Sequence, residues 1–258
     1  MGTATRVSII NNRGGVGKST TAVNLAYGLA LEGKRVLLVD ADPTGGATAA
    51  MGLVEEAAED ANFYTTADLM RGVPFAPSRN HNQVEGLDFL PATQRLSFLE
   101  PELYAQGQDG TTRLTRALDA IDRDYDYVLI DSPPHLSVLM TNVAVAGWNV
   151  IIPVRMDLGS IPMTFELERY LKGLRGTLQP KLRILGVLAT FFDDRATTPA
   201  ALYGDLRKLF AERVFKTVIH QARPVADAWG VGVPIISANP RHRGAKEYQQ
   251  LTQEVLSR

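Results

Sequence analysis

The glycine-rich segment at residues 11–20, NNRGGVGKST, has the residue types of a phosphate-binding loop. Its glycines let successive backbone N–H groups curl around phosphate oxygens without a Cβ in the way. Lys18 could reach the β- and γ-phosphates of a nucleotide, and the Ser19 hydroxyl could bind Mg²⁺. The predicted nucleotide-binding residues are Gly14, Gly15, Val16, Gly17, Lys18, Ser19 and Thr20.

Two positions of this segment depart from the pattern G-x-x-x-x-G-K-[ST] or add to it. Asn12 stands where the pattern has its first glycine, and Arg13 adds a second cation five residues before Lys18. The alternative, a glycine-rich turn without function, is disfavoured because G-K-S-T lies between a β-branched run and a helix-like segment. In that context the positive end of the helix dipole points at the same phosphate oxygens.

Three aspartates follow apolar, strand-like runs and complete the chemistry. Asp40 and Asp42 end the segment VLLVDAD, and Asp131 ends YDYVLID. Carboxylates at the carboxyl edge of a parallel sheet lie where such folds bind ligands. One carboxylate can hold Mg²⁺ or its waters while another orients an attacking water. A capped turn is the alternative for the D-x-D pair, and strands that end in Asp occur in any α/β protein.

The elements that must position these residues alternate between strand-like and helix-like segments. Such alternation predicts an α/β fold, with a mostly parallel sheet covered by helices on both faces. The expected strands are 6–10, 35–39, 87–90, 127–130, 150–154, 184–190 and 234–236. The expected helices are 18–32, 112–123, 136–146, 162–176, 199–211 and 244–256. We expect Gly33 to end the first of these helices, and residues 1–258 to form a single domain.

Composition narrows the possible functions. The 258 residues include no cysteine, which excludes disulfides, thiolate metal sites and iron–sulfur clusters. No apolar run approaches the ~20 residues of a membrane span, and the first residues lack the features of a signal peptide, so we expect a cytoplasmic protein. Residues 1–154 carry 11 Lys and Arg against 18 Asp and Glu, whereas residues 155–258 carry 16 against 10. A basic half is a hint of a polyanion-binding face, although uneven scatter of charges would give the same counts.

Taken in order, the three motifs resemble the ParA/MinD family of deviant-Walker-A ATPases, and most closely its ParA (Soj-type) partition branch. The family loop K-G-G-x-G-K-[ST]-[ST] is similar to R-G-G-V-G-K-S-T here, and its D-x-D-P-Q-G-N to D-A-D-P-T-G-G. The resemblance spans nearly the whole chain. It implies a P-loop NTPase fold of the SIMIBI type and slow, Mg²⁺-dependent ATP hydrolysis.

The resemblance also implies roles for individual residues. Family members bind ATP as a sandwich dimer, and the first lysine of K-G-G crosses to the phosphates of the partner subunit; Arg13 matches that position. An arginine keeps the charge and adds a planar fork for phosphate oxygens. The alternative is that Arg13 only forms a salt bridge to a neighbouring acid. By the same match, Asp42 positions the attacking water, Asp40 lies near the metal, and Asp131 is the Walker B aspartate.

Other positions of the family pattern are altered. Thr44 and Gly46 replace a glutamine and an asparagine of the second motif, which leaves partner-stimulated hydrolysis open. The base-binding I-P-x-N matches the segment I-H-Q-A, in which His220 and Ala222 take the base-contacting places. The absence of the family asparagine there leaves the selectivity for adenine open.

ParA members in the ATP-bound dimer bind DNA without sequence preference, through basic residues of the C-terminal half. The resemblance implies a homodimer, a ParB-like centromere-binding partner that stimulates hydrolysis, and a nucleoid-associated location. Arg195 matches one DNA-binding arginine of the family, and Arg223 lies one place before the second. Arg241 and Arg243 add to the same basic half. For each arginine alone, an ordinary solvated side chain is the alternative.

Three rival functions fit the same fold. A MinD-like cycle on membranes needs a basic amphipathic tail, but the last 15 residues carry only two cations, Lys246 and Arg258. Iron–sulfur carriers of this fold need cysteines, which this chain lacks. Metabolic enzymes of this fold bind a small substrate and need no cation that reaches across a dimer. A ParA-like ATPase that positions a protein cargo cannot be separated from DNA partition by sequence. The loop lies too close to residue 1 for a preceding helix-turn-helix domain, so we expect no sequence-specific operator binding.

Overall fold

The computed structural model describes residues 3–53, 63–78 and 84–258, and its centre is one seven-stranded sheet. The strands are β1 (Thr5–Ile9), β2 (Val36–Asp40), β3 (Leu87–Leu90), β4 (Tyr127–Asp131), β5 (Asn149–Arg155), β6 (Arg183–Phe192) and β7 (Val214–His220). All neighbouring strands run parallel, in the order β3-β2-β4-β1-β5-β6-β7. Their carboxyl ends therefore meet at one edge of the sheet.

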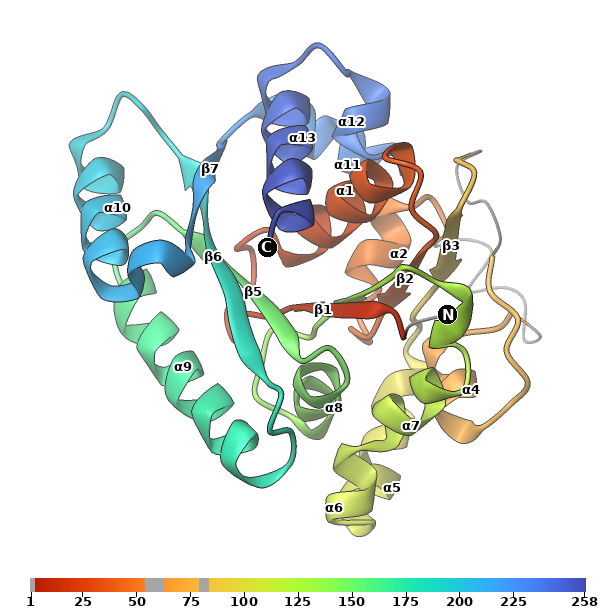
Figure 1. The fold of residues 1–258 in the computed structure, drawn as a ribbon. Helices are drawn as coiled ribbons and strands as arrows, with labels where there is room; N and C mark the ends of the chain where they lie inside the picture. The colour runs from red at the N-terminus through yellow and green to blue at the C-terminus, as the bar shows by residue number, and fades with distance from the viewer. Residues whose placement is uncertain (1–2, 54–62, 79–83) are drawn as a thin grey trace.

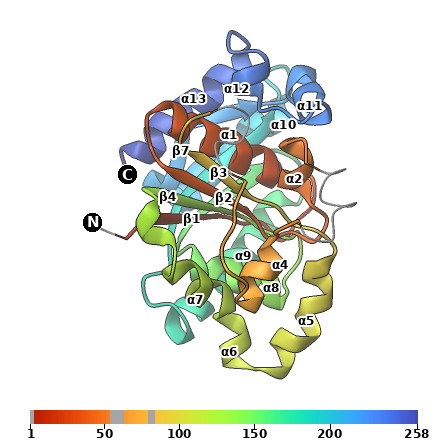
Figure 2. The ribbon, with the colours of Figure 1, turned by 90° about the vertical axis from the view of Figure 1, so that its right-hand side faces the viewer.

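Helices cover both faces of this sheet (Figures 1 and 2). One face packs against α1 (Lys18–Leu31), α2 (Gly46–Ala50), α11 (Arg223–Gly230), α12 (Ile235–Ala238) and α13 (Arg243–Leu256). The other packs against α4 (Thr66–Arg71), α5 (Arg95–Ala105), α7 (Arg113–Asp119), α8 (Val138–Ala146), α9 (Ser160–Thr177) and α10 (Thr197–Phe210), with the short α6 (Gln108–Thr111) beside them. Each face has its own buried apolar core, as the near-continuous apolar strands predict. The predicted fold class is confirmed.

The register of the sheet explains why the predicted site residues gather. β1 lies between β4 and β5, and β4 lies between β1 and β2. In this register Asp40 stands opposite Asp131, at the carboxyl ends of β2 and β4. The loop after β1 leads directly into α1, so it lies at the same edge. The parallel sheet thus brings all three motifs together although more than 100 residues separate the first from the last.

The seventh strand is not the one that the sequence predicted. The expected strand 234–236 is wrong, because Pro234 is the N-cap of α12 and Ile235 begins that helix. Its apolar residues are buried against α1, where the backbone N–H of Ile236 donates to Asn24 Oδ1. A short apolar run of this kind does not distinguish a strand from a buried helix. The edge strand is instead β7, which pairs with β6.

The remaining expected elements differ mainly at the helix ends, but the sequence predicted no helix at α2, α4, α5, α6 or α11. The expected helix 112–123 is two pieces, α7 and the single 3-10 turn η2 (Asp122–Asp124). A second 3-10 turn, η3 (Ala211–Arg213), connects α10 to β7. Gly33 follows the C-cap of α1 with a φ of 74°, so it ends the first helix as predicted.

Candidate functional site

The phosphate-binding loop is a turn of backbone between β1 and α1. Gly15 and Gly17 have φ angles of 67° and 88°, which an L side chain rarely adopts, and Gly17 is the N-cap of α1. Asn11 anchors the start of the loop: its side-chain amide donates to Pro153 O and its Oδ1 accepts the backbone N–H of Arg13. Thr190 Oγ1 donates to Val16 O at 2.9 Å, which anchors the other end.

Lys18 is the best-shielded cation of the loop. It begins α1, is only 7% exposed, and its Nζ donates to Arg13 O at 3.1 Å, so the side chain folds back along the loop. Burial lowers the pKa of Lys18, and the neighbouring carboxylates of Asp131 and Asp42 oppose this effect. The ammonium group is therefore held inside the loop, where phosphate oxygens would replace the carbonyl contact.

Asp131 is the most unusual acid of the site. It is completely buried, and neither of its carboxylate oxygens has a hydrogen-bond partner among the described residues. Burial raises the pKa of Asp131 well above its ordinary value, the Asp40 carboxylate raises it further, and Ser19 and Lys18 lower it. A buried carboxylate without partners is costly unless a cation or donor completes it. These oxygens beside the Ser19 hydroxyl fit a site for Mg²⁺ or its waters.

Asp40 has a different environment. Its Oδ1 accepts the backbone N–H of Asp42, and its Oδ2 accepts both the backbone N–H and the Oγ1 of Thr48. Burial raises the pKa of Asp40 to about 6, although these hydrogen bonds oppose the shift. Asp40 therefore ties α2 to the end of β2. Its predicted place near the metal stays a prediction.

Asp42 and the N-terminus of α2 lie next to the loop. Asp42 is 6% exposed, and its Oδ1 accepts the backbone N–H of Thr44 at 2.9 Å. A Cβ at Gly46 would lie 2.7 Å from Ser19 Oγ, so this glycine lets α2 approach the Ser19 hydroxyl closely. Gly46, which stands where the family has an asparagine, therefore lies directly against the site.

No cluster of three potential metal-ligating His, Asp or Glu side chains occurs in the part of the chain that is described. Mg²⁺ at a nucleotide needs only one or two protein ligands, because phosphate oxygens and waters supply the rest.

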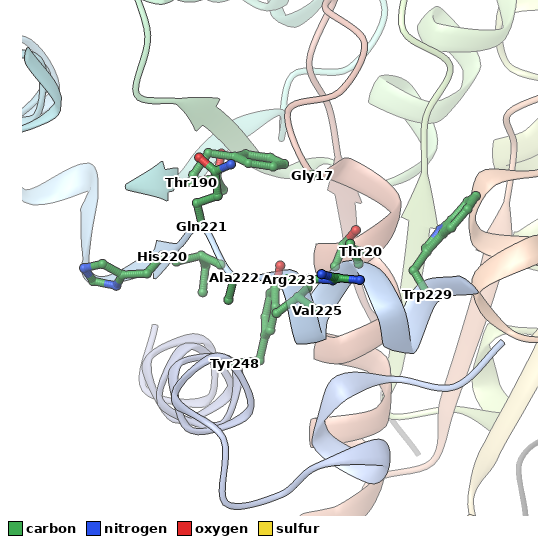
Figure 3. Close-up of a pocket in the computed structure, with 13 residues that line it drawn as sticks. Gly17, Thr20, Thr190, His220, Gln221, Ala222, Arg223, Val225, Trp229 and Tyr248 are labelled. Atoms are coloured by element: carbon green, nitrogen blue, oxygen red, sulfur yellow. The ribbon is translucent and has the colours of Figure 1, made fainter. Parts of the chain in front are cut away.

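A cavity of about 390 Å³ opens beside the loop, on the side of α11 and α13. Gly17 and Thr20 of the loop region line it, together with Thr190 and Phe191 of β6 and residues 219–223. Figure 3 shows His220 at one end of this group and Trp229 at the other. A mostly apolar cavity that adjoins a phosphate loop has the shape and position of a nucleobase site.

The two predicted base-contacting residues, His220 and Ala222, both line this cavity. They differ in which of their groups remain available to contact a base. His220 Nδ1 lies 2.6 Å from Glu247 Oε1, and its Nε2 lies 3.0 Å from Asp194 Oδ1 and 2.6 Å from an Arg243 nitrogen. The imidazole extends away from Ala222 in Figure 3. Ala222 offers only a methyl group and its backbone. Gln221, between them in the sequence, also lines the cavity, and its backbone N–H donates to Phe192 O at 3.0 Å.

Arg13 lies against its own chain. Its two terminal nitrogens contact the two Asp157 carboxylate oxygens at 2.5 and 2.9 Å, and one of them also lies 3.0 Å from Ser160 Oγ. The hydrogen bond to Asp157 raises the pKa of Arg13. Asp157 is therefore an acid with which Arg13 can form a salt bridge inside its own chain, as the alternative hypothesis requires. The role of Arg13 across a dimer stays a prediction.

Sequence reasoning missed Asp157, Arg155 and Phe191, which surround the loop. Arg155 Nη1 donates to Gly15 O at 3.3 Å, and its guanidinium lies 4.4 Å from the centre of the Phe191 ring. Phe191 has a φ of 51°, an uncommon conformation for a residue with a side chain. A signal for Arg155 and Asp157 existed, because both come directly after an expected strand, at the ligand-binding edge of a parallel sheet.

The four predicted DNA-binding arginines have different environments. Arg243, the first residue of α13, contacts Asp194 Oδ2 at 2.7 Å and Glu247 Oε1 at 2.8 Å. Arg223 begins α11 with a side chain that is 91% exposed and lies 3.7 Å from Asp227. Arg195 and Arg241 are exposed, and within residues 3–53, 63–78 and 84–258 neither forms an ion pair. The structure thus leaves Arg195, Arg223 and Arg241 open to a ligand, whereas Arg243 is largely used within the chain.

Among the described residues no helix is both long and apolar enough to span a membrane.

Comparison with known proteins identifies the family to which the chain belongs. A family model described as an AAA domain matches residues 4–184. The Bacillus subtilis protein Soj, a sporulation initiation inhibitor, is 37% identical over 97% of this chain and 98% of its own length.

Two further relatives agree with this match. The chromosome-partitioning ATPase Soj of Thermus thermophilus is 38% identical over 98% of this chain and 96% of its own length. Among solved structures, cobyrinic acid a,c-diamide synthase from Mycobacterium smegmatis, with bound ADP and magnesium, superposes with a TM-score of 0.82 at 27% identity, over 98% of this chain and 94% of that one. The near-full-length matches, together with the loop and the three aspartates, show that this chain belongs to the ParA/Soj family of chromosome-partitioning ATPases.

Proposed function

We propose that this protein binds ATP and Mg²⁺, dimerises around two nucleotides, and in that state binds DNA without sequence preference to partition a plasmid or chromosome. The observation that carries the proposal is the buried Asp131 carboxylate, which has no hydrogen-bond partner in the described chain and lies beside Lys18 and Ser19. Such a carboxylate needs a cation, and the phosphate loop is built next to it. The partition relatives and the fold point the same way.

The residues of the phosphate loop have different roles at the nucleotide phosphates. The loop N–H groups and Lys18 neutralise phosphate charge, while the Ser19 hydroxyl and Asp131 hold Mg²⁺ or its waters. Bound Mg²⁺ supplies charge neutralisation at the β- and γ-phosphates. Asp42, fixed by the backbone of Thr44, orients the attacking water. The base occupies the cavity between the loop and α11.

The dimer and its partners complete the cycle. Arg13 of each subunit contacts the phosphates in the other, as an arginine acting in trans. The exposed arginines Arg195, Arg223 and Arg241 contact DNA phosphates, which places the ATP-bound dimer on the nucleoid. A ParB-like centromere-binding protein stimulates hydrolysis, and the monomers that result release the DNA.

The test is retention of the Asp42→Ala protein on non-specific duplex DNA, with ATP·Mg²⁺ against ADP·Mg²⁺, across a salt series. Because loss of the water-positioning carboxylate blocks hydrolysis, we expect ATP to trap the dimer and retain it on DNA. Binding should fall steeply with salt, as phosphate contacts release counterions.

The control is the Lys18→Ala, Asp42→Ala double variant, which cannot hold the phosphates and should bind DNA weakly in both nucleotides. Equal or absent binding of the Asp42→Ala protein in ATP and ADP would contradict the DNA role. A protein cargo would then become the leading function for the same ATPase.

A further inference from the structure

The guanidinium of Arg13 is held by a two-point contact rather than by a single ion pair. Its terminal nitrogens face both oxygens of Asp157, and the Ser160 hydroxyl lies 3.0 Å from one of them. The same hydroxyl donates to Asp157 Oδ1 at 2.6 Å, so it also orients the carboxylate. Paired N–H···O contacts of this kind fix the geometry of an arginine as well as its position.

Both sides of this contact are positioned by elements that frame the nucleotide site. The backbone of Arg13 is fixed by Asn11 Oδ1 on one side and by the Lys18 ammonium on the other. Asp157 follows the carboxyl end of β5, and Ser160 is the first residue of α9 after Gly159, whose φ is 90°. The contact therefore joins the phosphate loop to the neighbouring strand and helix within one chain.

We propose that Asp157 and Ser160 form a latch that holds Arg13 on its own subunit until the ATP-bound dimer assembles. The inference rests on the proposed function, in which Arg13 acts on the phosphates of the partner subunit. The terminal nitrogens that Asp157 engages are the ones that an arginine offers to phosphate oxygens. Arg13 must leave the latch before it can make the second contact, so the latch opposes dimerisation.

Arg155 makes the opening of the latch less costly. Its Nε lies 3.2 Å from Asp157 Oδ2, and its guanidinium is stacked on Phe191. When Arg13 leaves, Asp157 keeps one cation and the Ser160 hydroxyl instead of becoming an unpaired carboxylate. Partial burial raises the pKa of Asp157, but the hydrogen bonds from Arg13 and Ser160 and the charge of Arg155 outweigh this and keep the carboxyl ionised at neutral pH.

The experiment measures the monomer–dimer dissociation constant by sedimentation equilibrium with AMP-PNP·Mg²⁺, for the wild type, Asp157→Asn, Arg13→Ala and the double variant. Asp157→Asn should tighten the dimer by about threefold to thirtyfold, because two half-exposed latches open per dimer. The Asp157→Asn effect should disappear when Arg13 is already alanine, which a merely structural role of Asp157 would not produce.

Asp126→Asn is the matched control. It removes another arginine–carboxylate pair of similar exposure, Arg35–Asp126, at the opposite edge of the sheet, and should leave dimerisation unchanged. If Asp157→Asn leaves the dissociation constant unchanged or raises it while Arg13→Ala weakens the dimer, the latch is wrong and the proposed function stands. If Arg13→Ala dimerises like the wild type, the role of Arg13 across the dimer is wrong, and the latch falls with it.

Discussion

At the residue scale, Asp40, Asp42 and Asp131 differ in how burial and hydrogen bonding affect their carboxylates. Asp131 is buried without a hydrogen-bond partner in the described part of the chain, whereas Asp40 is buried with three donors around it. Asp42 is also buried, but its carboxylate caps the turn at Thr44. Of the three, Asp131 is the carboxylate that a bound cation would stabilise most. We therefore expect Asp131 to link metal binding to the stability of the fold.

The ligand-free protein should lose stability as the pH rises from 5 to 7.5. The pKa of Asp40 is raised to about 6 and that of Asp131 lies well above its ordinary value, so the folded state holds protons that the unfolded state releases near pH 4. We expect the free energy of unfolding, from urea titrations, to fall by about 1–3 kcal/mol over this range.

The Asp131→Asn variant isolates the part that belongs to Asp131. It should be more stable than the wild type at pH 7.5 without ligand, by about 2 kcal/mol, because no buried charge remains unpaired. It should also gain less stability from ATP·Mg²⁺ than the wild type does. An unchanged dependence on pH in this variant would show that Asp131 is not the group responsible.

At the element scale, the site depends on how closely α1 packs against α13. Gly28 in α1 faces Thr252 in α13, and a Cβ at Gly28 would lie 2.3 Å from Thr252 Oγ1 and 3.3 Å from its Cβ. The Thr252 hydroxyl donates to Tyr248 O, so it is not free to move away at no cost. Because α1 begins at Lys18, displacement of this helix would also displace the phosphate loop.

Gly28→Ala should therefore destabilise the protein by about 1–3 kcal/mol, through overpacking between two helices. Gly173→Ala in α9 is the matched control, because a Cβ there meets no heavy atom within 4 Å. It should stabilise by about 0.4–1 kcal/mol, since alanine restricts the unfolded chain. Chemical denaturation measures both. Addition of Thr252→Ala to Gly28→Ala should restore most of the loss, and failure to do so would place the clash elsewhere.

At the scale of the whole molecule, the basic C-terminal half is only partly available to a ligand. Arg243 is neutralised by Asp194 and Glu247, and Arg213 contacts Glu168. Arg195 and Arg241 remain exposed without an ion pair in the described ranges. Counting basic residues along the sequence therefore overestimates the charge that DNA phosphates would meet.

Arg195→Ala and Arg241→Ala, in the Asp42→Ala background, should each lower the salt dependence of DNA binding. We expect the slope of log K against log[salt] to become shallower by about 0.9 for each phosphate contact that is lost. Fluorescence anisotropy with a duplex of arbitrary sequence, over a series of salt concentrations, gives the slope. Arg243→Ala should change it less, because its charge is already compensated within the chain.

Arg175→Ala serves as the control for these variants. Arg175 lies in the last turn of α9, on the other face of the sheet; it is exposed and forms no ion pair within the described residues, so its charge is as free as that of Arg195. It should leave the slope unchanged. If Arg175→Ala lowers the slope as much as Arg195→Ala does, binding is spread over the whole surface and the predicted DNA face is wrong.

The sequence alone determined the phosphate loop, the places of the three aspartates and the parallel sheet. These features are encoded locally, because the loop requires glycine at left-handed positions such as Gly15 and Gly17, and apolar runs alternate with helix-length segments. The position of the site then follows from the general rule that ligands bind at the carboxyl ends of parallel strands. The seventh strand could not be assigned in the same way, since the apolar run at 234–236 fits a strand and a buried helix equally well.

The contacts that the side chains of the site make depend on the packing of distant elements. Arg13 and Asp157 are 144 positions apart in the chain, and their contact arises because β5 pairs directly with β1. The unpaired state of Asp131 and the neutralised state of Arg243 likewise depend on which distant groups the fold brings within hydrogen-bond distance. Contacts of this kind are set by packing between elements remote in sequence, and residue types and spacing along one chain do not specify them.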